Sequence, residues 1–174
     1  DEFGDLVIRR EASSVGELLY SLARELAWPV DKETASCMYT AMVADTGSFR
    51  YDNTTPQTHL IAAELIELGA SPWDTACALY ESASLAHQKL LGAVALTLDV
   101  SLDGRLAQMV CTRQVMRDTG ATDEDTEGLA NFGRSVAGVE VCVLYIEGDA
   151  EVRLSFRSNG AVDVAAVAAQ FGGG

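Results

Sequence analysis

The spacing of apolar residues changes once along this 174-residue chain, and that change constrains the fold more than any other feature. Up to about residue 90, apolar side chains recur every three or four positions, which is the period of an amphipathic helix. Beyond that point they alternate, which is typical of strands. The sequence therefore predicts an α/β chain with a mainly helical part over residues 1–90 and a small α+β part over residues 91–174.

Helix start signals divide the first part. Ser14 and Glu17 have the Ser-x-x-Glu spacing of a capping box, so we expect a helix to begin there. An apolar stripe follows and predicts its core-facing side, formed by Val15, Leu18, Leu19, Leu22 and Leu26. The start signals of three further helices are Asp31, Thr55-Pro56 and Ser71-Pro72.

Turn signals and alternation organise the second part. Asp103-Gly104 is a strong hairpin signal between two short alternating segments. Residues 139–146 are apolar on both faces, so this strand is expected inside the sheet. The strand after it alternates: Val152, Leu154 and Phe156 predict a core face, and Glu151, Arg153, Ser155 and Arg157 predict a polar face.

The charge balance excludes one large class of partner. Lys and Arg total 12 against 26 Asp and Glu, which gives a net charge of −14. Such a chain repels a long polyanion, so we expect no long duplex nucleic acid as partner. No apolar run approaches the roughly 18 residues of a membrane span, and we expect no membrane partner. The four cysteines have no metal-binding spacing, which favours free thiols in the cytoplasm.

Asp45 breaks the pattern of its helix. It follows Met38, Ala41 and Met42 on the predicted apolar stripe, near the C-terminal end of the helix. A carboxylate there meets both desolvation and the negative end of the helix dipole, so it needs a cation. A hard divalent metal ion would supply one. The alternatives are an Asp45 that caps the next turn in solvent, or an ion pair with Arg50.

Two further features favour an anion site. Arg153, Ser155 and Arg157 share one strand face, where arginines can grip an anionic group with forked hydrogen bonds. The alternative is a solvated sheet face on which Glu151 pairs locally. The glycine run at residues 172–174 can present backbone N–H groups to a phosphate, or can simply end a helix. No hydrolase triad, P-loop or dinucleotide glycine pattern occurs.

Several blocks of the sequence resemble one family. Residues 44–59, ADTGSFRYDNTTPQTH, closely resemble the block around the last metal-binding Asp of the DHH phosphoesterases, in the branch of bifunctional oligoribonucleases and pAp phosphatases. Residues 131–135, 138–141, 155–158 and 163–164 are similar to the family's DHH-associated C-terminal domain. Residues 171–174 resemble the start of its Gly-Gly-Gly-His motif. These blocks follow the family's order over nearly the whole chain.

The resemblance implies a two-metal phosphoesterase, usually manganese-dependent, acting on a short oligoribonucleotide or nucleotide. Residues 1–90 would be the C-terminal part of the catalytic domain, and residues 91–174 the substrate-binding domain, truncated at its glycine-rich motif. A homodimer is a further expectation. By position, Asp45 would bind Mn²⁺. The implied substrate-binding residues are Arg134, Arg157, Ser158, Gly172, Gly173 and Gly174, to which the strand face adds Arg153.

The departures from the family are equally specific. The Asp-His-His motif, the acidic motifs before it and the histidine after the glycine run are absent from the 174 residues. One carboxylate cannot hold two metal ions, so we expect this segment alone to be catalytically incomplete and its parent chain to be an enzyme. The alternatives are a cyclic-dinucleotide phosphodiesterase, which only substrate assays separate, and a nucleotide-binding module without catalysis.

Overall fold

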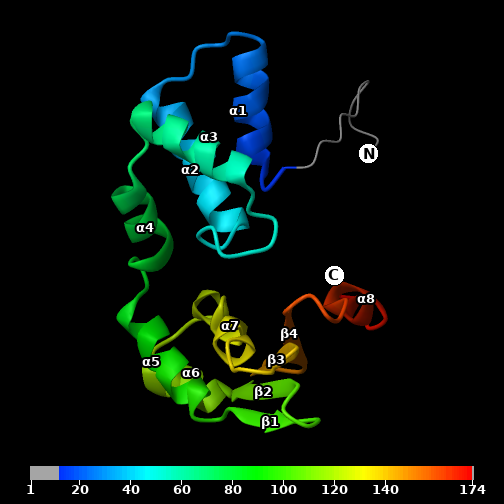
Figure 1. The fold of residues 1–174 in the computed structure, drawn as a ribbon. Helices are drawn as coiled ribbons and strands as arrows, with labels where there is room; N and C mark the ends of the chain where they lie inside the picture. Colours follow the sequence, from blue (N-terminus) through cyan, green and yellow to red (C-terminus); the bar gives the residue numbers. More distant parts are fainter. Residues whose placement is uncertain (1–11, 174) are drawn as a thin grey trace. The chain divides into compact units, whose positions relative to one another are not determined.

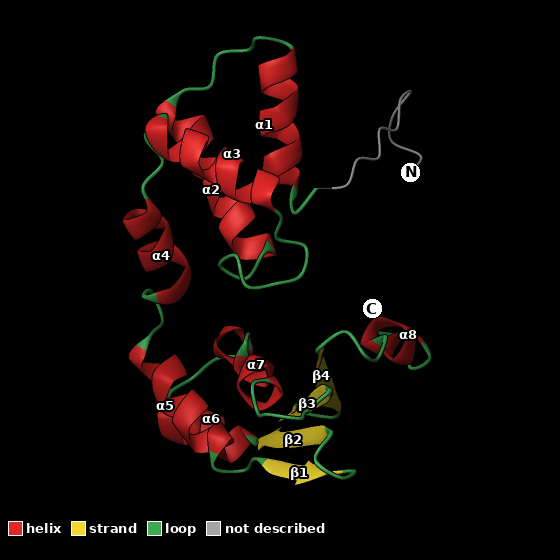
Figure 2. Cartoon of the chain, viewed as in Figure 1, coloured by secondary structure: helices red, strands yellow, loops and turns green. Residues whose placement is uncertain are grey.

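The computed structural model describes residues 12–173, which form two compact units that divide between Ser82 and Ala83. In the described residues the first unit consists of helices, and the second combines helices with a four-stranded sheet (Figures 1 and 2). The mixed α/β architecture confirms the predicted fold class. The division falls after residue 82 rather than residue 90, because α5 (Leu85–Ala95) packs in the core of the second unit.

The first unit contains α1 (Val15–Glu25), α2 (Lys32–Asp45), α3 (Pro56–Glu67) and α4 (Pro72–Tyr80). Each begins at its predicted cap, because the side chains of Ser14, Asp31, Thr55 and Ser71 each accept a backbone N–H three residues further on. The core lies between α1, α2 and α3, where Met42, Ile61 and Leu65 are fully buried. Local capping chemistry thus fixed all four helix starts.

The predicted core stripe of α1 is wrong. Four of its five residues are exposed, from 36% at Leu22 to 63% at Val15, and Leu18 is half-buried, whereas Tyr20 and Ala23 are buried. The reason is close packing at Gly16, where a Cβ atom would lie 2.4 Å from the Met38 carbonyl oxygen of α2. The glycine lets α1 approach α2 on this side, which leaves the leucine stripe facing away from the described core.

The second unit is built on the strands β1 (Asp99–Ser101), β2 (Leu106–Cys111), β3 (Val141–Glu147) and β4 (Val152–Ser158). They are ordered β1-β2-β3-β4, and β2 and β3 are parallel while the outer pairs are antiparallel. The hairpin between β1 and β2 and the interior position of β3 are confirmed. The other elements are α6 (Arg113–Thr119), the 3-10 helix η1 (Glu124–Thr126), α7 (Leu129–Arg134) and α8 (Val164–Ala169).

The two faces of β4 are the reverse of the prediction. In an antiparallel pair, opposed residues share a face, and Arg153, Ser155 and Arg157 oppose the buried β3 residues Ile146, Leu144 and Cys142. The arginines therefore lie on the helix-covered face, while Val152 and Leu154 on the other face are 57% and 43% exposed. Because β4 is an edge strand, its charged side chains extend past the core into solvent.

One contact between α7 and the sheet is close enough to test by adding a methyl group. A Cβ atom at Gly133 would lie 2.6 Å from the buried Cys142 Sγ, whereas nothing lies within 4 Å of the same position at Gly92. We predict that Gly133→Ala lowers the free energy of unfolding of the second unit by about 1–3 kcal/mol through overpacking. Gly92→Ala should instead raise it by about 0.5–1 kcal/mol. Hydrogen exchange of the β3 amides measures both, and equal effects of the two changes would contradict this packing.

Candidate functional site

The chain leaves α2 through a left-handed turn that begins two residues after Asp45. Gly47, Ser48 and Phe49 have φ values of 54°, 63° and 61°. The two non-glycine residues each cost roughly 1–3 kcal/mol in this region, so the surroundings must impose the conformation. Thr46 does so in part: its buried Oγ1 donates to the Met42 carbonyl oxygen (2.6 Å) and accepts the Phe49 N–H (2.9 Å).

Asp45 is exposed at the end of α2, so the predicted position on a buried apolar face is wrong. The buried face of α2 is formed by Ala35, Tyr39, Met42 and Val43. The alternative ion pair is also absent from the described residues, because Arg50 Nε donates to the Gly47 carbonyl oxygen at 2.6 Å. The Asp45 carboxylate has no hydrogen bond or ion pair within residues 12–173, so it is open to an external cation.

A single open carboxylate suits one position in a metal site. Manganese takes carboxylate oxygen readily, and Asp45 offers two such atoms. Within the part of the chain that the structure describes, no three His, Cys, Asp or Glu side chains group as a metal site. A two-ion centre at Asp45 would therefore take its other ligands from outside these residues.

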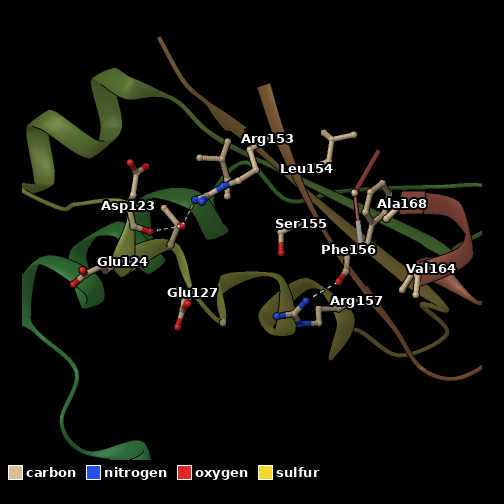
Figure 3. Close-up of a pocket in the computed structure, with 15 residues that line it drawn as sticks. Asp123, Glu124, Glu127, Arg153, Leu154, Ser155, Phe156, Arg157, Val164 and Ala168 are labelled. Atoms are coloured by element: carbon tan, nitrogen blue, oxygen red, sulfur yellow. Dashed lines mark hydrogen bonds between the residues drawn. The ribbon is translucent and has the colours of Figure 1, made fainter. Parts of the chain in front are cut away.

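The second unit holds a cavity of about 880 Å³ beside β4, which we call the arginine pocket (Figure 3). Arg153, Ser155 and Arg157 line it from β4. Figure 3 shows Ser155 and Arg157 pointing to the same side of the strand, with Leu154 on the other side. The remaining wall comes from the η1 segment up to Gly128, from Ile146 of β3, and from α8 with Gly173. The structure thus brings the predicted strand-face residues into one concave site.

The two arginines of the pocket are held differently. Arg153 Nη2 donates to Thr126 Oγ1 at 2.9 Å, and Thr126 in turn donates to the Asp123 carbonyl oxygen at 2.6 Å. Arg157 is exposed, and its Nη1 donates to the neighbouring Phe156 carbonyl oxygen at 2.9 Å. A guanidinium carries five N–H groups, so Arg157 retains donors for an anion. Arg153 is fixed by a neighbouring element, and Arg157 is oriented by its own strand.

Acidic side chains lie beside Arg153 in the same pocket. Asp123, Glu124 and Glu127 line the arginine pocket, gathered on the left of Figure 3 away from Val164 and Ala168. The acids and the arginines therefore share one cavity, and Arg153 is held by Thr126, which lies between Glu124 and Glu127 in the chain. A small ligand with one or two phosphates fits such a site better than an extended polyanion, whose further phosphates would meet the acids.

Two titratable groups near the pocket serve structure rather than chemistry. The Thr122 backbone N–H (2.9 Å) and the Ser84 hydroxyl (2.8 Å) donate to Asp125 and hold the pKa of its carboxyl below the usual range. Burial raises the pKa of the Cys111 thiol, and the charge of Arg153 offsets part of that rise. Cys111 is fully buried and stays protonated at neutral pH, so it is no nucleophile.

Arg134 and Ser158 lie outside the lining of the arginine pocket. Arg134 Nη1 donates to Asn159 Oδ1 at 3.0 Å, and Asn159 Nδ2 donates to the carbonyl oxygens of Val139 (2.7 Å) and Arg134 (3.3 Å). Ser158 Oγ accepts the Gly160 N–H at 3.0 Å, which closes the turn after β4. These residues are neighbours of one another at the end of β4.

The glycine run ends α8. The Gly172 and Gly173 N–H groups donate to the carbonyl oxygens of Ala169 (3.2 Å) and Ala168 (3.0 Å), so both are engaged within the chain. Gly173 lines the arginine pocket, and Gly172 has a φ of 78°. Gly174 lies outside the described residues.

Sequence reasoning missed three residues that hold the site residues in place: Thr126, Asn159 and Asn53. Thr126 and Asn159 contact Arg153 and Arg134 over 27 and 25 positions, and no local pattern predicts contacts at that range. Asn53 falls inside the block that carries the family resemblance, which was the only signal pointing to it.

These features define a two-unit chain with an exposed carboxylate in one unit and an arginine-lined pocket in the other. No protein-family model matches it. It is 31% identical over its whole length to the bifunctional oligoribonuclease and PAP phosphatase NrnA of Bacillus subtilis, and 30% identical over 99% to that of Thermus thermophilus. It covers 56% and 52% of those proteins, so the chain spans about half the length of the curated relatives it matches.

A solved structure is similar in both sequence and fold. An exopolyphosphatase-related protein from Bacteroides fragilis superposes on 98% of the chain and 51% of its own length, with a TM-score of 0.91 and 28% identity. The resemblance to the DHH phosphoesterases is thereby confirmed, and the chain is a homologue of the bifunctional oligoribonucleases and PAP phosphatases throughout its length. These relatives are hydrolases by name. No helix in the described residues is long and apolar enough to cross a membrane.

Proposed function

We propose that this chain supplies the substrate-gripping unit and one metal ligand of a manganese-dependent phosphoesterase that hydrolyses short oligoribonucleotides and the 3′-phosphate of pAp. The observation that supports this most directly is the pair of arginines, Arg153 and Arg157, in one cavity of the second unit. The names of the curated relatives supply the substrate class. The four free cysteines fit a cytoplasmic enzyme.

The arginine pocket would bind the substrate phosphate. Arg157 is exposed and keeps parallel N–H donors, so it can form a bidentate pair with a phosphate. Arg153, fixed by Thr126, would add a second positive charge. The acidic residues of the pocket and the net charge of −14 oppose the entry of further phosphates, which favours short substrates.

Asp45 would hold one metal ion. When bound, a two-ion manganese centre lowers the pKa of a coordinated water and stabilises the charge that develops on the phosphate. Asp45 contributes an exposed carboxylate that no described residue neutralises, at the end of a helix whose next turn is fixed by Thr46. Because the backbone is fixed, only the side-chain rotation of Asp45 has to be ordered when it binds a cation.

The first prediction from this proposal concerns the 174-residue chain by itself. We expect it to fold and to bind pAp, but to release neither phosphate nor mononucleotides in the presence of Mn²⁺, because its described residues group too few ligands for two ions. The test measures product release from pAp and from a dinucleotide. The comparison is a chain of the relatives' full length that contains these residues, which we call the full-length chain. Comparable rates for the two chains would contradict the assignment of Asp45 to a larger site.

The second prediction concerns Asp45 in the full-length chain. Asp45→Asn should lower turnover at least about a hundredfold, because a neutral amide is a poor ligand for a hard cation. The melting temperature should change little, since the side chain is exposed and unpaired within the described residues. Asp52→Asn removes an exposed carboxylate from the same turn and should leave turnover unchanged. Near-normal activity of Asp45→Asn at limiting manganese would show that Asp45 is a solvent-exposed residue and no metal ligand.

The third prediction concerns Arg157. Arg157→Ala should weaken pAp binding and kcat/KM by about 10- to 150-fold, the loss of roughly 1.5–3 kcal/mol for a charge-assisted bond. Arg157→Lys should recover only part, since an ammonium cannot reproduce the fork. Arg117→Ala, an exposed arginine of the same unit outside the pocket, is the matched control. Titrations with pAp and with Mn²⁺ should show a loss of affinity only for pAp. An unchanged pAp affinity would show that this strand face is ordinary solvated surface.

A further inference from the structure

Asn53 ties the carbonyl group of Asp45 to a distant part of the first unit. Its Nδ2 donates to the Asp45 carbonyl oxygen at 3.2 Å and to the Ser13 carbonyl oxygen at 3.0 Å. An amide NH2 group has two N–H bonds, and both are used here. The two acceptors are 8 and 40 positions away in the chain, so Asn53 joins the end of α2 to the segment before α1.

The Ser13 end of this bridge is anchored in the interior. Ser13 donates both its backbone N–H (3.1 Å) and its hydroxyl to Glu17 Oε2, and Thr58 Oγ1 donates to the same oxygen at 3.0 Å. Ser13, Glu17 and Thr58 are 5%, 6% and 0% exposed. Thr58 also belongs to the capping box of α3 with Thr55. Two helices therefore fix the position of the Ser13 carbonyl group.

Glu17 departs here from the expected capping box. Its side chain accepts from Ser13 rather than from the Ser14 N–H, while Ser14 Oγ accepts the Glu17 N–H at 3.1 Å as expected. A carboxylate that is buried in this way is satisfied by three donors. The glutamate thus serves to hold the segment to which Asn53 is attached.

The bridge closes the strained turn between Asp45 and Asn53. Ser48 and Phe49 keep left-handed conformations that the surroundings must impose. Thr46 fixes the turn from within, and Asn53 fixes its far end against α1 and α3. Without the Asn53 bonds, the last turn of α2 could unwind and change the direction of the Asp45 side chain.

We propose that Asn53 is a positioning residue for Asp45, which sets the affinity for the metal ion without touching it. The inference rests on the proposed role of Asp45 as a metal ligand. Asn53 itself lies at the surface, so its replacement should cost the fold little. Outer groups that orient metal ligands typically change metal affinity by about 10- to 100-fold when they are removed.

The test uses Asn53→Ala and Asn53→Leu in the full-length chain. Both lack the two donors, and they differ in size, so an effect common to both comes from the lost hydrogen bonds. Titration with Mn²⁺, followed by the electron paramagnetic resonance signal of the free ion, should show about 10-fold weaker binding. The affinity for pAp should stay unchanged. In the 174-residue chain, amides 46–54 should exchange faster while the rest of the first unit does not.

Asn159→Ala is the matched control, because Asn159 also donates to two carbonyl groups, in the other unit. It should leave manganese binding unchanged. Unchanged manganese affinity in both Asn53 variants, with a loss in Asp45→Asn, would overturn the positioning role and leave the proposed function intact. A uniform loss of stability together with equal losses in manganese and pAp affinity would also overturn it, as a merely structural effect. Normal manganese binding by Asp45→Asn would refute the proposed metal ligand itself.

Discussion

The pairing of β4 with β3 determines what the second unit can bind. The register opposes Arg153 to Ile146 and Arg157 to Cys142, so both arginines lie on the face that the helices cover. A slip of one residue would move them to the other face and put Leu154 in their place. Since β4 is the edge strand, these side chains reach beyond the buried core of β3, and Arg153 meets the η1 segment. The arginine pocket follows from that one register.

In the first unit the constraint acts on the backbone that carries the exposed Asp45 side chain. The turn after Asp45 is strained and is tied at both ends, by Thr46 inside and by Asn53 against the buried Ser13 and Glu17 group. A strained backbone conformation persists only where the surrounding contacts hold it in place. The hydrogen bonds that fix the backbone after Asp45 therefore support the proposed role of its side chain.

Features that depend on a few neighbouring residues could be predicted from the sequence. The four caps of the first unit, the hairpin at Asp103-Gly104 and the interior position of β3 belong to this class. Which face of an element is buried could not be predicted: α1 turns Gly16 rather than its leucines to α2, Asp45 lies outside the apolar face of α2, and β4 has its faces reversed. Which face is buried depends on how closely elements that are distant in the chain pack together. The spacing of apolar residues along the sequence carries no information about that packing distance.

The central claim is that the second unit recognises a nucleotide phosphate in the arginine pocket. The most direct measurement is a titration of the isotopically labelled 174-residue chain with pAp, followed by the amide and arginine side-chain NMR signals. Saturable shifts centred on Thr126, Arg153, Ser155 and Arg157 are predicted, with the β1–β2 hairpin unaffected. Shifts confined to other residues, or none at saturating pAp, would contradict the account.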